Sequence, residues 1–227
     1  MIERPSPNHN ARPPGKPIDM LVIHYTGMPD AESALQRLTD PKAEVSSHYL
    51  IDEEGHAYRL VDEQRRAWHA GISYWAGKRD INGISIGIEL ANPGHEFGYR
   101  PFAEPQMSAL VSLCRAIIAR HPIPPQRVLG HSDVATARKI DPGELFDWQR
   151  LAASGIGKWT KPAEGPKDLA AVQKALARFG YEVTASGEAD EATRLALSAF
   201  QRHFRPARID GLADAETSAL LHGLLAS

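Results

Sequence analysis

The chain has 227 residues, of which 42% are hydrophobic and 24% charged, and its 26 basic and 28 acidic side chains leave a formal net charge of −2. This composition is typical of a globular protein and is too apolar for a disordered one. The near-neutral charge gives no electrostatic reason to expect nucleic-acid binding. The single cysteine, Cys114, excludes an internal disulfide and a cysteine-rich zinc finger, so a metal site must use His, Asp or Glu.

No apolar run approaches the roughly 18–20 residues that a membrane-spanning helix needs, so we expect no transmembrane segment. Residues 1–17 contain five prolines and lack the apolar stretch of a secretion signal, and we expect them to form an extended N-terminal arm. The predicted compartment is therefore the cytoplasm, with the periplasm or cell envelope as the alternative. We expect a monomer, although the oligomeric state has no signature in the sequence.

Residues 18–154 alternate short apolar runs with amphipathic segments, which predicts an α/β fold with a mixed central sheet flanked by helices. Strands are expected over residues 20–25, 45–51, 57–61, 85–90 and 127–130. Helices are expected over residues 31–38, 106–120 and 143–152.

The composition changes at residues 155–166, which are rich in Gly, Pro and Lys and are expected to be a linker. Beyond it the pattern Gly-x-Ala-Asp-x-x-Thr occurs twice, starting at Gly187 and at Gly211. Each copy predicts a turn followed by a helix whose N-cap is the aspartate. Together with the helical apolar face of residues 169–179, these repeats predict a small three-helix domain over residues 167–227.

Polar side chains lie at the ends of three predicted apolar strands: His24, Glu89 and His131, with Asp141 further along the chain. A polar group in an apolar strand is costly unless it is paired or binds a metal. Two histidines and one carboxylate can form a tetrahedral zinc site whose fourth position is left to water. On the residues alone, buried structural histidines are the alternative explanation.

The motifs LVIHYT, SSHYLID, RRAWHAG, SIGIELAN, GHSD and KIDPGELFDW occur in this order over about residues 18–150. They resemble the zinc N-acetylmuramoyl-L-alanine amidases, whose fold is shared with peptidoglycan recognition proteins and phage lysozyme-amidases. The tail resembles the bacterial peptidoglycan-binding domain. The resemblance implies a hydrolase, with its catalytic domain over residues 18–154, that acts on peptidoglycan or soluble muropeptides in cell-wall turnover or recycling.

The bond cut would be the amide between N-acetylmuramic acid and L-alanine of the stem peptide, and the 1,6-anhydro form of the sugar is one candidate substrate. The alternative is a non-catalytic peptidoglycan receptor of the same fold. Receptors of this kind typically lose a zinc ligand, whereas every ligand position is filled here.

By the same resemblance the cofactor is zinc, and its ligands are His24, His131 and Asp141. Glu89 would be the general base and acid, and Lys139 would face the developing oxyanion. Ser47 stands where some phage members have a tyrosine, which favours the branch that uses Glu89. Substrate contacts are expected from Tyr25, His48, Trp68, His69 and Asn92. The remaining histidines, among them His203, are expected at the surface.

Overall fold

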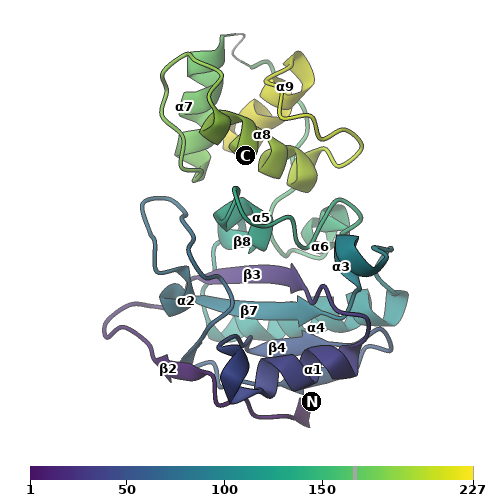
Figure 1. Ribbon diagram of the computed structural model, residues 1–227. Helices are drawn as coiled ribbons and strands as arrows, with labels where there is room; N and C mark the ends of the chain where they lie inside the picture. The colour runs from purple at the N-terminus through teal and green to yellow at the C-terminus, as the bar shows by residue number, and fades with distance from the viewer. Residues whose placement is uncertain (166–167, 227) are drawn as a thin grey trace.

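The structure is a computed structural model that describes residues 1–165 and 168–226. The predicted end of the linker at residue 166, the predicted start of the tail domain at residue 167 and the last residue lie outside the described residues. An α/β part carries a three-helix part on one side, next to β8 and α5 (Figure 1). None of the described helices is long and apolar enough to span a membrane.

A six-stranded mixed sheet with the order β1-β5-β4-β7-β3-β8 forms the centre of the α/β part, as predicted. Neighbouring strands are parallel except for β4 and β5, which form an antiparallel hairpin. The strands of this sheet are β1 (Ile2–Glu3), β3 (Met20–Tyr25), β4 (Tyr49–Ile51), β5 (Ala57–Arg59), β7 (Ser85–Leu90) and β8 (Val128–Gly130). A separate antiparallel pair consists of β2 (His9–Ala11) and β6 (Arg65–Ala67).

Helices cover both faces of the sheet, with α1 in front of it and α4 behind it in Figure 1. The two are α1 (Ala31–Thr39) and α4 (Glu104–Arg120). Leu50 of β4 packs towards α1, whereas Ile23 and Ile88 share a core with α4. Side chains alternate between the two faces along a strand. His24 therefore lies on the opposite face of β3 from Ile23, the face that it shares with Leu50 and that α1 covers.

Short elements account for most differences from the predicted secondary structure. The predicted strand over residues 45–51 begins only at Tyr49, because the backbone of residues 45 and 46 bonds to Asn8 and Trp68 instead of to a neighbouring strand. The helix predicted from residue 143 begins at Trp148, where the Asp147 carboxylate caps it. The remaining short helices are α2 (Ile81–Ile84), α3 (Gly94–Phe97), α5 (His131–Val134) and α6 (Trp148–Ala153), with 3₁₀ turns over Pro41–Ala43 and Pro125–Arg127.

The three-helix part is built on the repeated turn. Its helices are α7 (Leu169–Phe179), α8 (Glu191–Phe204) and α9 (Ala215–Ala226). In both copies the aspartate Oδ1 accepts the backbone N–H of the threonine three residues later at 2.8 Å (Asp190–Thr193 and Asp214–Thr217). A buried glutamine of the preceding helix accepts the N–H of the turn glycine at 2.8 Å in both copies (Gln173–Gly187 and Gln201–Gly211). These bonds satisfy the turn and confirm the predicted N-caps.

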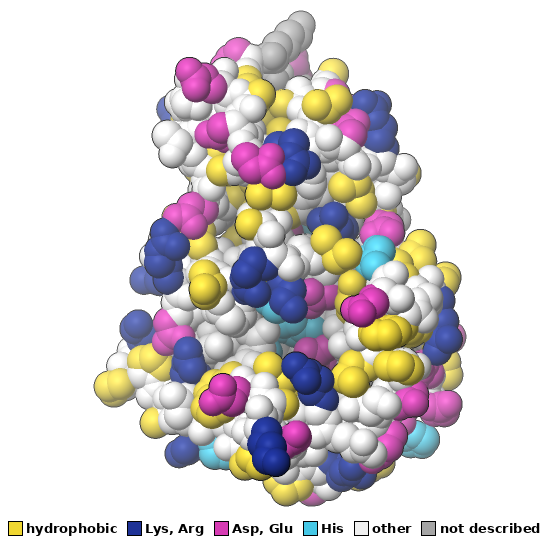
Figure 2. Space-filling model, viewed as in Figure 1, with side chains coloured by type: hydrophobic (Ala, Val, Ile, Leu, Met, Phe, Trp, Pro, Cys, Tyr) yellow, Lys and Arg dark blue, Asp and Glu magenta, His cyan; other side chains and the backbone are white. Residues whose placement is uncertain are grey.

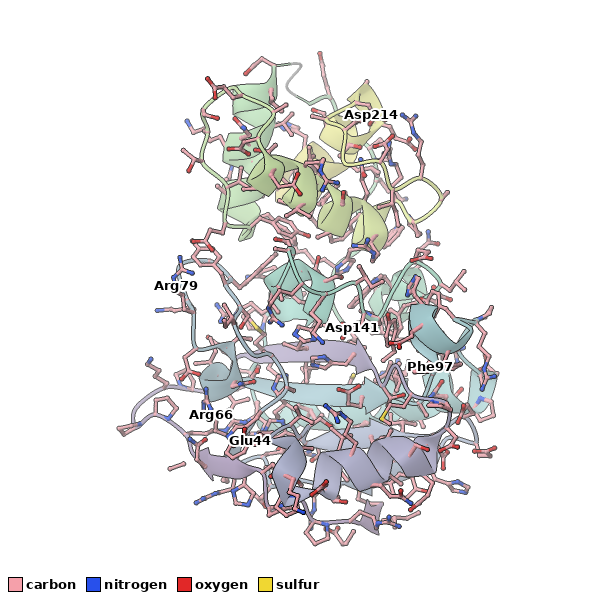
Figure 3. All side chains as sticks on the ribbon, viewed as in Figure 1. Glu44, Arg66, Arg79, Phe97, Asp141 and Asp214 are labelled. Atoms are coloured by element: carbon pink, nitrogen blue, oxygen red, sulfur yellow. The ribbon has the colours of Figure 1, made fainter. Side chains whose placement is uncertain are left out.

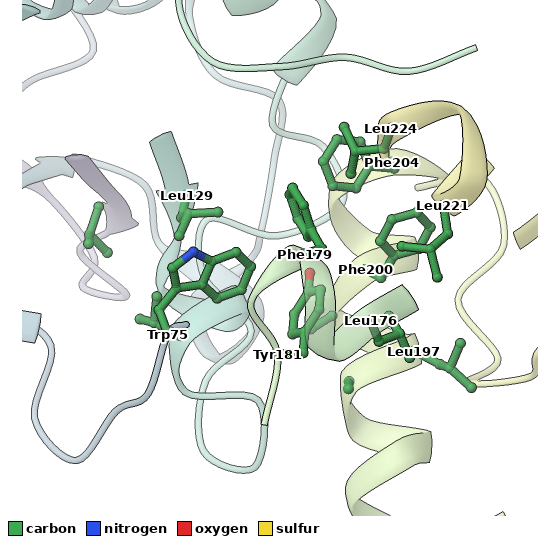
Figure 4. Packing of buried hydrophobic residues seen from close by; sticks show 14 of the residues in the cluster. Trp75, Leu129, Leu176, Phe179, Tyr181, Leu197, Phe200, Phe204, Leu221 and Leu224 are labelled. Atoms are coloured by element: carbon green, nitrogen blue, oxygen red, sulfur yellow. The ribbon is translucent and has the colours of Figure 1, made fainter. Parts of the chain in front are cut away.

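The two parts share one hydrophobic core (Figure 4). The Trp75 ring of the α/β part meets the Tyr181 ring at 4.9 Å and the Phe179 ring at 5.3 Å, both edge to face. The expectation of a surface position for His203 is wrong, because its ring is buried between Trp148 and Phe204, at 3.8 and 4.0 Å. The three-helix part is thus packed directly onto the α/β part, and the domain boundaries stay a prediction.

Candidate metal and catalytic site

The candidate residues meet at the carboxyl ends of three neighbouring parallel strands. His24 is the penultimate residue of β3 and is paired in register with Glu89 on β7. His131 directly follows β8 and begins α5. Because parallel strands end at the same edge of a sheet, residues more than a hundred positions apart come into contact here. Asp141 reaches the same place from the loop after α5, between the sheet and the three-helix part (Figure 3).

Three possible ligand atoms form a nearly equilateral triangle. His24 Nδ1 lies 3.0 Å from His131 Nδ1, and Asp141 Oδ2 lies 3.1 Å from each of them. All three residues are buried. Ligands at the usual zinc bond lengths of about 2.0–2.2 Å and tetrahedral angles would be about 3.3 Å apart. The triangle therefore fits one face of a tetrahedral metal site, and the cluster could bind a divalent cation.

The charge state of these groups suits a metal. Burial lowers the pKa of His24 to about 4, with the neighbouring His131 acting in the same direction. For Asp141, burial alone would raise the pKa, but the two imidazoles hold it well below its ordinary value. His24 is therefore neutral and Asp141 ionised at neutral pH, the forms in which these side chains coordinate metals.

Hydrogen bonds hold the Asp141 loop from both sides. The backbone N–H of Ser132 donates to the Asp141 carbonyl at 2.9 Å. The Tyr99 hydroxyl donates to the carbonyl of Pro142 at 2.7 Å. The loop is thus tied both to α5 and to the segment after β7, which fixes where the carboxylate lies.

Glu89 has the environment of an acid–base group. Its Oε2 atom is buried and has no hydrogen-bond partner within residues 1–165 and 168–226. Burial, together with the nearby Asp141, raises the pKa of Glu89 well above its ordinary value, and Lys139 partly opposes this. Buried polar atoms are nearly always hydrogen-bonded, and those that are not often have a catalytic role.

A family model described as N-acetylmuramoyl-L-alanine amidase matches residues 14–144, more than half of the chain. The chain belongs to this amidase family. A second model, described as a putative peptidoglycan binding domain, matches residues 166–221. The amidase match covers every residue of the triangle and both proposed catalytic residues, Glu89 and Lys139.

The amidase is similar to several named enzymes. The N-acetylmuramoyl-L-alanine amidase AmiD of Escherichia coli is 43% identical over 92% of this chain and 82% of its own length. The solved complex of AmiD with the substrate anhydro-N-acetylmuramic acid-L-Ala-D-γ-Glu-L-Lys superposes with a TM-score of 0.83 at 42% identity, covering 94% of this chain and 91% of AmiD.

AMPDH3 of Pseudomonas aeruginosa, in complex with anhydromuramic pentapeptide, gives a TM-score of 0.83 at 35% identity and covers 93% of this chain and 92% of its own. The 1,6-anhydro-N-acetylmuramyl-L-alanine amidase AmpD of Haemophilus influenzae is 35% identical over 66% of this chain and 89% of its own length. AmiD and AmpD are both named amidases, which favours the enzyme over a non-catalytic receptor.

The amidase has a cavity of about 390 Å³ above the triangle. Histidine and carboxylate side chains lie at the bottom of a hollow, with Lys and Arg side chains around it (Figure 2). Among the residues expected to contact substrate, Tyr25, Trp68 and His69 line this cavity. Lys139 also lines it, and its ammonium makes no hydrogen bond to any other described residue.

His48 and Asn92 do not line the cavity of the amidase. The His48 ring is fully buried and accepts the N–H of Gly87 at Nδ1, at 3.0 Å. The buried Asn92 side chain closes the turn after β7, where its Oδ1 accepts the N–H of Gly94 at 3.0 Å. Both side chains accept hydrogen bonds from the backbone of the fold, and their contact with substrate stays a prediction.

Sequence reasoning missed two cavity-lining cations of the amidase, Arg37 and Arg138. Arg138 directly precedes the predicted site residue Lys139, and this position in the sequence could have indicated that Arg138 lines the same site. Arg37 lies in the last turn of α1, where basic residues are common for reasons of helix stability. Nothing in its local sequence distinguishes it from such a residue.

Proposed function

We propose that the chain is a zinc-dependent amidase that cuts the bond between N-acetylmuramic acid, including its 1,6-anhydro form, and L-alanine of the stem peptide, in cell-wall turnover and recycling. The observation that carries this proposal is the triangle of His24, His131 and Asp141 next to Glu89, whose buried Oε2 has no hydrogen-bond partner among the described residues. The anhydromuramyl peptides in the complexes of AmiD and AMPDH3 support the substrate class.

The zinc ion, when bound by the triangle, would polarise the amide carbonyl and lower the pKa of water. Glu89 accepts the proton of the attacking water and then delivers it to the leaving amine nitrogen, so the same carboxyl serves as base and acid. Lys139 lines the cavity, and its ammonium, which no described residue engages in a hydrogen bond, faces the negative charge that develops on the carbonyl oxygen.

The cations of the cavity suit an anionic substrate. A stem peptide whose D-glutamate is linked through its γ-carboxyl keeps a free α-carboxylate. Arg37 and Arg138 line the cavity beside Lys139, so the opening is rich in positive charge. Such a charge distribution favours binding of peptides that carry free carboxylates.

The test uses the purified chain and a soluble anhydromuropeptide. A chelator should abolish hydrolysis and added zinc should restore it. Glu89→Gln should lower kcat by about 10²–10⁴-fold. The matched control is Glu96→Gln, an exposed carboxylate outside the cavity, which should keep full activity. Normal turnover by metal-free protein or by the Glu89→Gln variant would contradict the assigned roles.

We assign wall binding to the three-helix part. Two neighbouring hollows beside α7 and α9 are lined by basic side chains, among them Lys174, Arg178 and His222, and no described acidic side chain lines either of them. This charge suits the carboxylates of the stem peptides and would raise the local concentration of substrate. Lys174→Glu with Arg178→Glu should weaken co-sedimentation with sacculi while leaving hydrolysis of soluble muropeptide unchanged. Unchanged co-sedimentation would contradict this role.

The cytoplasmic compartment, with the periplasm or cell envelope as alternative, and the monomeric state stay predictions. Fractionation of cells that produce the protein decides the first, and light scattering of the purified chain decides the second.

A further inference from the structure

We propose that the segment His69–Ala70 forms an outer hydrogen-bonding layer around the triangle and fixes which nitrogen of each ligand imidazole carries the proton. The inference rests on the metal site of the proposed function, and it makes His69 a positioning residue rather than a substrate contact. Metal-binding histidines commonly donate the N–H of their other ring nitrogen to a fixed acceptor. Here one loop supplies the acceptors for both histidines.

The His131 side of this layer is simple. His131 Nε2 lies 3.1 Å from the carbonyl oxygen of Ala70. A carbonyl oxygen can only accept, so Nε2 must carry the proton. A neutral imidazole has one proton, which leaves Nδ1 of His131 with a free lone pair directed into the triangle.

The His24 side needs a chain of three bonds. The Ser85 hydroxyl lies 2.6 Å from the carbonyl oxygen of Ile81 and must donate to it. Ser85 Oγ lies 3.1 Å from His69 Nε2. Because the hydroxyl proton of Ser85 already bonds to the Ile81 carbonyl, Ser85 Oγ accepts the Nε2–H of His69. His69 Nδ1 is then an acceptor, and it takes the Nε2–H of His24 at 3.1 Å.

The backbone carbonyl of Ile81 in α2 therefore sets the direction of all three hydrogen bonds. The last ring nitrogen, His24 Nδ1, is left without a proton, as the triangle requires. If His69 were turned into the opposite tautomer, its Nδ1–H would point at His24 Nε2 and Ser85 would lose its donor. The proton of His24 would then move to Nδ1 and block coordination.

The loop itself is held in place by the fold. The Asn82 side-chain Oδ1 accepts the backbone N–H of His69 at 3.1 Å and that of Ala70 at 2.8 Å. Arg138 donates to the Ala70 carbonyl at 3.0 Å from the outer side. A Cβ atom at Gly87 would lie 2.5 Å from the His69 ring, so glycine in β7 makes room for this imidazole. These contacts explain a glycine and an asparagine that no catalytic role requires.

The first experiment observes the protons directly. In a long-range ¹H–¹⁵N correlation spectrum of zinc-free protein at mildly alkaline pH, His24, His69 and His131 should each show a protonated Nε2 and a bare Nδ1. In His69→Leu, the His24 ring should lose this preference. A protonated Nδ1 on His69 in the unaltered chain would overturn the proposal.

The second experiment measures zinc affinity of metal-free protein by competition with a chromophoric chelator. His69→Leu removes the acceptor and should weaken zinc binding about 10–100-fold. His69→Asn places Oδ1 near the position of Nδ1 and should retain most of the affinity. Ser85→Ala, a milder change, should fall between the two. The control is Ser47→Ala, a buried serine that donates to the Tyr49 carbonyl at 2.7 Å away from the triangle, and it should bind zinc normally.

The outcomes separate this inference from the proposed function. If the unaltered chain binds no zinc, the proposed function fails. If it binds zinc and the folded His69→Leu variant binds it equally well, the proposed function stands and the positioning role of His69 is overturned. Weak binding by both His69→Leu and His69→Asn would also overturn it, because the acceptor would then not be the cause.

Discussion

Two buried histidine–aspartate groups meet at the short helix α5, which supplies His131 to one group and Asp133 to the other. The two groups differ in how many hydrogen-bond donors face the carboxylate. In the triangle, His24, His131 and Asp141 direct three lone pairs at one point. We call the second group the docking cluster (Asp133, Tyr181 and His203). Within the part of the chain that the structure describes, each hydrogen bond to the Asp133 carboxylate comes from a donor: the Tyr181 hydroxyl at 2.6 Å, the His203 Nδ1 at 2.8 Å and the Gly130 N–H at 2.8 Å.

The comparison teaches that residue type and burial do not distinguish a metal site from a structural contact. Both groups are buried and both pair His with Asp. Burial and the adjacent Asp133 raise the pKa of Tyr181 well above its ordinary value, so its hydroxyl remains a donor. The two groups differ in the number of hydrogen-bond donors around the carboxylate. A carboxylate that receives hydrogen bonds from several donors stabilises the fold, whereas three acceptor atoms that converge without a proton between them suit a cation.

The strongest way to break the comparison is to remove the carboxylate of the docking cluster. Asp133→Ala leaves three buried donors without their acceptor, and we expect the free energy of unfolding to fall by about 3–5 kcal/mol. Urea denaturation of the zinc-free proteins measures it. A loss below about 1 kcal/mol would mean that the docking cluster does not hold the two parts together.

Zinc should act on only one of the two groups. At a zinc concentration of 100 times Kd, the free energy of unfolding should rise by about 2.7 kcal/mol in the unaltered chain. His203→Ala should show the same rise from a lower starting stability, whereas Asp141→Ala should show almost none. An equal rise in all three proteins would place the metal elsewhere.

A third carboxylate, Glu63, sharpens the comparison through pH. Burial alone would raise its pKa, but hydrogen bonds from Arg120, Tyr49 and His121 lower it to about 2. Because the pKa of Glu63 is depressed in the folded state, the ionised carboxylate stabilises the folded protein. This stabilisation is complete above the ordinary pKa near 4.5 and is lost as the pH falls from there towards 2.

Glu63→Gln should therefore cost about 2 kcal/mol at neutral pH and progressively less below pH 4.5. Urea denaturation of the unaltered chain and of Glu63→Gln, repeated across the acid pH range, measures the difference in their free energies of unfolding. A cost that does not change with pH would contradict an ionised, donor-supplied carboxylate at this position.

The smallest effect is expected from Tyr181→Phe, which removes one donor to Asp133 and keeps the ring that packs on Trp75. The loss should be about 1 kcal/mol. It should depend on the docking cluster, so a double variant with Asp133→Ala should lose less than the sum of the two single changes. Additive losses would mean that the hydroxyl and the carboxylate act independently.

The sequence predicts the elements that have a clear period. The apolar runs at β3 and β7, the apolar face of α4 and the repeated aspartate caps at 190 and 214 were all expected and are present. The strands β1, β2 and β6 have only two or three residues, too few for a repeating pattern. They depend on pairing with distant segments, which local sequence does not encode.

The site was predictable only in part for the same reason. Family motifs pointed to the triangle, whereas spacing alone left buried structural histidines as an alternative. The partners of His203 and His48 could not be deduced, because a histidine in a helix or before a strand has no local sign of the aspartate or the backbone amide that it will meet. The role of His69 depends on a serine and a carbonyl that only the folded chain brings together.

The turn α5 has a practical consequence for protein engineering. Its first residue, His131, belongs to the triangle. Its third residue, Asp133, accepts hydrogen bonds from Tyr181 and His203 of the three-helix part. If a foreign wall-targeting module replaced the three-helix part, the Asp133 carboxylate would lose two of its hydrogen-bond donors, only two residues from the metal ligand His131. A working chimera would have to bring its own hydroxyl and ring N–H to Asp133, or replace Asp133 in the same design.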